Sequence, residues 1–75
     1  MPLYHLVVKL ADGSDGEMAD GEFRDDAAAI DDARHALAGM ARDAAQEGRR
    51  FEEAIEVLNE VGTVIAVVAP EPNAT

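Results

Sequence analysis

The sequence lacks cysteine and tryptophan, and its aromatic residues are one tyrosine and two phenylalanines among 75 residues. A chain without cysteine has no disulfide bond to hold its fold and suits a reducing compartment, here taken to be the cytoplasm. No apolar run approaches the roughly 20 residues of a membrane-spanning helix, and Met1–Leu10 has no signal-peptide pattern. So short a chain buries only about 60% of its surface on folding, which favours oligomers.

Basic residues are also scarce, with 6 Lys and Arg against 16 Asp and Glu, for a net charge of −10. Nucleic acid binding needs a basic surface to meet the phosphates, and this balance argues against it. The same negative charge repels anionic membrane surfaces. A protein partner with a basic surface remains compatible with this composition.

One long helix is predicted over residues 25–48. Asp25 can cap its first turn, and Gly48 can adopt the left-handed conformation that ends a helix. Apolar residues recur at steps of three and four and should form one narrow buried stripe, namely Ile30, Ala33, Leu37, Met40, Ala41 and Ala44. Gly39 lies inside this helix, either without a structural reason or because a strand or a second subunit approaches closely there.

The remaining apolar segments alternate and predict strands. The first covers residues 4–10, an Asp- and Gly-rich turn region follows over 11–21, and residues 21–24 form a short strand with Phe23 against the core. Residues 51–58 and 63–69 form a hairpin whose turn uses Gly62. This order predicts a two-layer α+β domain over residues 1–69, β-β-α-β-β with a sheet of three or four strands, and a flexible tail over 70–75.

A single helix covers only one face of such a sheet. If Tyr4, Leu6, Val8, Val64, Ala66 and Val68 face the helix, then the alternation turns Val7, Ile65 and Val67 to the open face. An exposed apolar patch on a small domain favours association. The leading hypothesis is therefore a non-catalytic interaction or structural module that forms a homodimer through Val7, Ile65 and Val67.

The acidic segment of residues 12–32 supports an alternative, a regulatory protein that binds a basic partner surface. The acidic side chains proposed for this surface are Asp12, Asp15, Glu17, Asp20 and Asp26. Asp12, Asp15, Glu17 and Asp20 could also form a weak cation site. An EF-hand loop is excluded, because the position that requires glycine holds Glu17 or Asp20 in the two possible registers.

Catalytic and cofactor-binding patterns are missing from the sequence. Ser14 and the two threonines have no histidine set beside them in a recognisable pattern. Asp31 and His35 share one helix face, but a metal site needs further ligands. We therefore expect no enzyme activity, no cofactor and no metal, with Asp31 and His35 as an ordinary surface pair.

The chain resembles a family of short bacterial proteins defined by a domain of unknown function. The resemblance covers the chain up to Ala69. It rests on the Met-Pro-x-Tyr start, the Gly-Glu-Phe-x-Asp helix entry at 21–25, the Gly-Arg pair at 48–49 and the Ile-x-Val strand at 55–57. Gly21 and Glu22 are adjacent here, whereas members usually have a residue between them, and Leu58 stands where a charged residue is usual. The resemblance implies a small α+β domain and no activity.

Overall fold

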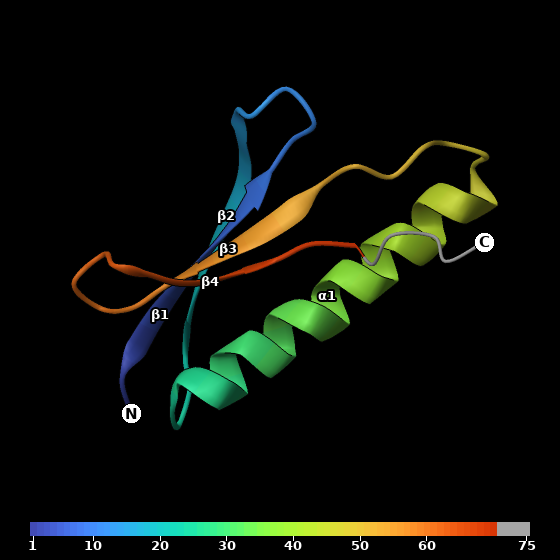
Figure 1. Cartoon of the computed structure of the whole chain (residues 1–75). Helices are drawn as coiled ribbons and strands as arrows, with labels where there is room; N and C mark the ends of the chain where they lie inside the picture. Colours follow the sequence, from blue (N-terminus) through green and yellow to red (C-terminus); the bar gives the residue numbers. More distant parts are fainter. Residues whose placement is uncertain (71–75) are drawn as a thin grey trace.

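Five elements follow one another in the predicted order β-β-α-β-β in the computed structural model, which describes residues 1–70 (Figure 1). The elements are β1 (Leu3–Lys9), β2 (Asp15–Glu22), α1 (Asp26–Gln46), β3 (Ala54–Leu58) and β4 (Val64–Val68). A four-stranded antiparallel sheet forms one layer and the helix forms the other, so the predicted α+β class is confirmed. The predicted tail lies, from residue 71 onward, outside the described residues.

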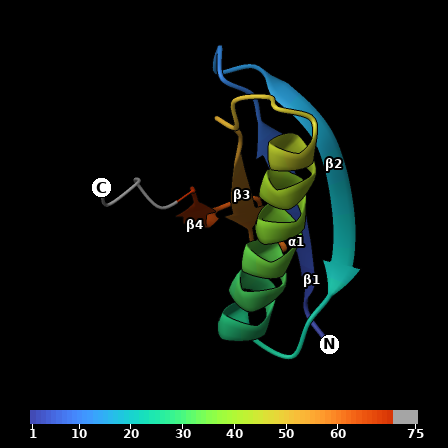
Figure 2. The same ribbon diagram turned by 90° about the vertical axis from the view of Figure 1, so that its right-hand side faces the viewer.

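The strand order is β2-β1-β3-β4, which makes β2 and β4 the two edges of the sheet. Helix α1 packs against β3 and β4 on one face. Seen from the helix side, β2 and β4 lie on opposite sides of α1 (Figure 2). The sequence left the strand order open, because two hairpins around one helix can pair in several ways.

Strand β2 corrects the predictions of a turn region over residues 11–21 and of a short strand over residues 21–24, since Phe23 and Arg24 lie beyond its end. The strand occupies Asp15–Glu22, and only the five residues from Leu10 to Ser14 form a tight turn, with Gly13 at a positive φ of 88°. Asp and Gly are poor strand formers, which hid this strand from a reading of local preference. It forms because β1 supplies its backbone hydrogen bonds in a register from Leu3↔Glu22 to Val7↔Met18.

Both predicted helix ends are confirmed, within the two residues by which such boundaries vary. The Asp25 carboxylate accepts a hydrogen bond from the Ala28 backbone N–H at 2.9 Å. At the other end Gly48 has a φ of 69°, and the Arg49 N–H donates to the Ala44 carbonyl at 2.9 Å. The carbonyls of Asp43, Ala44 and Ala45 in the last turn are therefore satisfied by the residues that leave the helix.

The core lies between α1 and the centre of the sheet. Its buried side chains are those of Tyr4, Ala29, Ala33, Leu37, Ile55 and Val57. Ile30, which was predicted to lie in the buried stripe, is only partly buried, and Ala29 takes the buried position instead. Alanine accounts for three of the four buried helix residues, so the helix contributes mostly small side chains to the core.

Phe23 packs against this core as predicted, and it does so edge-to-face with Tyr4. The two ring centroids are 6.0 Å apart and the ring planes cross at 66°. A Cβ atom at Gly21 would lie 2.9 Å from the Phe23 ring, so any other residue there would displace the ring. The loop between β2 and α1 is thus held against the start of the helix.

The predicted faces of β4 need correction at two residues. A bulge shifts the register of β4 against β3, since Val57 lies opposite Ala66 but Leu58 lies opposite Val64. Ile65 falls between these pairs and packs against the core cluster rather than facing away from it. Val64, expected to face the helix, is 46% exposed. One extra residue in the strand is enough to break the period-two alternation on which the prediction rested.

Candidate interaction surfaces

The two edge strands of the sheet differ in charge. Strand β2 carries Asp15, Glu17, Asp20 and Glu22 in eight residues, whereas β4 has the sequence Val-Ile-Ala-Val-Val and no charge. An edge strand presents a row of unpaired backbone N–H and C=O groups, and charged side chains discourage another strand from pairing with them. β4 is therefore the edge that is suited to receive a further strand.

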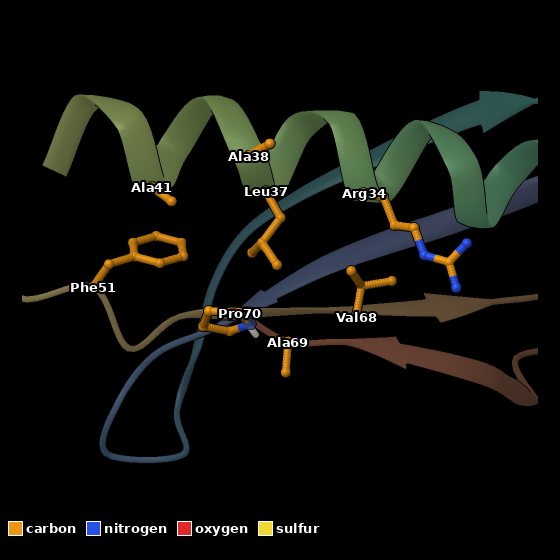
Figure 3. Close-up of a pocket in the computed structure, with 8 residues that line it drawn as sticks. All are labelled: Arg34, Leu37, Ala38, Ala41, Phe51, Val68, Ala69 and Pro70. Atoms are coloured by element: carbon orange, nitrogen blue, oxygen red, sulfur yellow. The ribbon is translucent and has the colours of Figure 1, made fainter. Parts of the chain in front are cut away.

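A groove of about 440 Å³ separates β4 from the side of α1 (Figure 3). Its lining residues are Arg34, Leu37, Ala38, Ala41, Phe51, Val68, Ala69 and Pro70. Leu37 and Val68 point toward one another across it, Phe51 lies below Ala41, and Ala69 points away from the helix. The groove is mainly apolar, with Arg34 as its charged lining residue, so it extends the uncharged surface of β4 toward the helix.

The open face of the sheet presents two valines beside this same edge. Val67 is 59% exposed and Val64 is 46% exposed. Val67 was one of the three residues predicted to form an interface, whereas Val64 was not. Ile65 was predicted there as well, but it packs against the core cluster.

Val7 lies on the open face as predicted, yet it is only 5% exposed. In the sheet it stands between Met18 of β2 and Glu56 of β3. A small side chain on a central strand is covered by its longer neighbours even when no second layer lies above it. Val7 therefore supports the sheet from within and offers little area to a partner.

Charged contacts occupy the β1–β2 half of the open face. His5 Nδ1 and Asp20 Oδ1 lie 2.6 Å apart, and the Lys9 ammonium group contacts Asp15 and lies 3.8 Å from Glu56 Oε1. The hydrogen bond to Asp15 raises the pKa of Lys9. The open face is thus divided, with polar and charged contacts centred on β1 and exposed valines along β4.

The acidic residues predicted to bind a basic partner do not form one surface. Asp15 and Asp20 lie on the open face against Lys9 and His5, whereas Asp26 accepts a hydrogen bond from the Tyr4 hydroxyl at 2.6 Å. Asp12 accepts hydrogen bonds from the hydroxyl and the N–H of Ser14, which lower its pKa. These four carboxylates therefore contact other residues of the same chain at separate places on the domain. Glu17 is different, since it borders a groove beside α1.

A family model for a domain of unknown function (DUF6894) matches residues 3–69. The chain belongs to the DUF6894 family. The match confirms the resemblance noted in the sequence, and no activity comes with it. Comparisons of this DUF6894 chain with curated proteins and with solved structures find no match.

In the DUF6894 domain, Asp31 and His35 lie together on the exposed helix surface. His35 Nδ1 is 3.5 Å from Asp31 Oδ2 and 2.9 Å from the Asp31 carbonyl oxygen. Over residues 1–70 no three His, Cys, Asp or Glu side chains gather where they could hold a metal ion, and no helix there is long and apolar enough to cross a membrane. The features of this DUF6894 chain that suggest function are its grooves and its β4 edge.

Proposed function

We propose that this DUF6894 domain is a non-catalytic interaction module of the cytoplasm that forms a homodimer by placing β4 of one copy beside β4 of a second. The observation that carries the proposal is the uncharged β4 edge, with exposed valines on one face and an apolar groove on the other. A strand added there would gain backbone hydrogen bonds and would cover apolar side chains on both faces.

Electrostatics favours β4 over any other contact between two copies. Each chain carries a net charge of −10, so most of its surface repels a second copy. The β4 strand has no charged residue, and the acidic β2 strand lies at the opposite edge of the sheet. An antiparallel pair of β4 strands is self-complementary about a two-fold axis, which is the commonest symmetry of homodimers.

The alternative function, regulation of a basic partner through the whole acidic segment of residues 12–32, has less support. Most of the acidic residues named for it are engaged within the fold and lie on different faces.

The homodimer is tested by placing a negative charge beside the β4 edge. Val67→Glu should lower the dimer affinity by about tenfold or more, because the two-fold axis brings both new carboxylates near one another. Met18→Glu is the matched control, since Met18 is 67% exposed on the same open face but lies on β2. Sedimentation equilibrium measures the association, and circular dichroism checks that each variant remains folded.

The expected result is a wild-type dimer, a dimer for Met18→Glu and a monomer for Val67→Glu at the same concentration. A wild-type protein that stays monomeric at high micromolar concentration would refute the homodimer. A dimer that survives Val67→Glu but dissociates with Met18→Glu would place the interface at β2 and would refute the β4 interface.

A further inference from the structure

A second groove lies on the other side of the helix, between α1 and β2. Helix α1 packs against β3 and β4, so it leaves the helix-side face of the β1–β2 hairpin partly uncovered (Figure 2). The groove has a volume of about 230 Å³. Leu6 and Val8 from β1, Met40 from α1 and Ala19 from β2 give it an apolar lining. Leu6, Val8 and Met40 lie in elements that the sequence predicted, whereas Ala19 lies in the segment predicted as a turn. These residues come together only because β2 pairs with β1.

The charged residues that line this groove are both acidic and stand on opposite walls. Glu17 belongs to β2 and Asp32 belongs to α1. Within residues 1–70 neither carboxylate takes part in an ion pair, in contrast to Asp15, which contacts the Lys9 ammonium group on the open face. The groove therefore combines an apolar floor with two carboxylates that the fold does not neutralise.

We propose that this groove binds a basic amphipathic segment of a partner protein. An apolar side chain of the partner would occupy the floor, and Lys or Arg side chains beside it would meet Glu17 and Asp32. Met40 has a flexible side chain that can adapt to apolar groups of different shape, as methionine does at adaptable binding surfaces.

Charge decides among the possible occupants. A second copy of this chain carries −10 and would bring more acidic side chains against Glu17 and Asp32. Phosphate groups of nucleic acids or lipids are repelled for the same reason. A segment that is apolar on one side and basic on the other complements both the floor and the walls.

Binding at this groove is independent of the homodimer, because the groove and β4 lie on opposite sides of α1. A Val67→Glu monomer should therefore bind the same segment with unchanged affinity. A monomeric protein would therefore not contradict peptide binding at the groove, and an absence of peptide binding would not contradict the homodimer.

The experiment uses a fluorescently labelled synthetic peptide of Leu and Lys arranged with the helical period, so that Leu lies on one face of the helix and Lys on the other. Fluorescence anisotropy at low salt measures its affinity for the full chain. The double variant Glu17→Gln/Asp32→Asn should bind about fivefold more weakly, since an exposed charge contact contributes less than about 1 kcal/mol. Asp43→Asn/Glu60→Gln is the matched control, with the same change in net charge away from the groove.

A second variant tests the floor of the groove. Ala19 is exposed on β2 and lines the groove, so Ala19→Arg should fill it and repel the peptide while the fold is kept. Val61→Arg, in an exposed turn outside the groove, is its control for added positive charge. We expect Ala19→Arg to weaken binding several-fold more than Val61→Arg does.

Three results would overturn the proposal. The first is a peptide that does not bind at all, and the second is an equal loss of affinity in the two charge-neutralised double variants, which would show attraction to net charge alone. The third is equal binding of a control peptide in which every Lys is replaced by Glu. Binding that is restricted to the basic peptide, and that depends on Glu17, Asp32 and Ala19, supports it.

Discussion

Tyr4 offers a direct test of how the helix is attached to the sheet. It is 3% exposed, and its hydroxyl donates a hydrogen bond of 2.6 Å to Asp26 Oδ1 in the first turn of α1. That hydrogen bond, with burial and the negative charges of Asp26, Asp25 and Glu60, raises the pKa of Tyr4 to about 12. Ionisation would replace the donated proton with a second negative charge facing a carboxylate.

The direction of the pH effect follows from this raised pKa. In the unfolded chain tyrosine loses its proton near pH 10. The contribution of the protonated Tyr4 to folding is therefore fully present below pH 10 and is lost as the pH rises from about 10 to about 12. Tyr4→Phe should show a smaller loss of stability than the wild type over that interval. Lys9 also titrates at high pH in both proteins, so only the difference between them reports Tyr4.

The assay is simplified because the chain has one tyrosine and no tryptophan. Tyrosinate absorbance in the near ultraviolet then reports Tyr4 alone, and far-ultraviolet circular dichroism at each pH shows whether the domain is still folded. Asp26→Asn keeps a hydrogen-bond acceptor but removes the charge, so the midpoint should move from about 12 toward 10. A wild-type midpoint near 10 in the folded domain would refute the placement of Tyr4 beneath the start of α1.

Two further predictions concern the helix. Leu37→Ala should cost about 2–5 kcal/mol of unfolding free energy, because Leu37 is buried in the core cluster and so small a domain has little stability to lose; an unchanged urea midpoint would mean that the helix is rotated away from the sheet. Gly39→Ala should raise the unfolding free energy by about 1 kcal/mol, since an added Cβ meets no atom within 4 Å and alanine is the better helix former. A Gly39→Ala variant that weakens the dimer without changing the stability of the monomer would contradict this prediction and would place a second subunit against Gly39.

The sequence predicted the elements whose side chains alternate or repeat with the helical period. The helix, the first strand and the final hairpin are all strongly patterned, and the structure confirms each of them. Gly48 was predicted to end the helix and Gly62 to form the hairpin turn, and both have the positive φ that these roles require.

The parts that could not be predicted depend on contacts between distant segments. Strand β2 contains few residues that favour a strand, and it is defined by its pairing with β1. The bulge in β4 moved Val64 to the open face and Ile65 toward the core, which no count of alternating residues could anticipate. The groove between α1 and β2 was missed because its walls come from one segment read as a turn and one read as a helix.

The contrast between the two edges of the sheet also bears on how far association can proceed. Two chains joined through β4 would form a continuous sheet that ends on both sides in a β2 strand, with its acidic residues outermost. Neither outer strand invites a third chain, because like charges would face one another along its length. Association would therefore end at the dimer, and the exposed valine-rich edge strand would be prevented from starting a fibre.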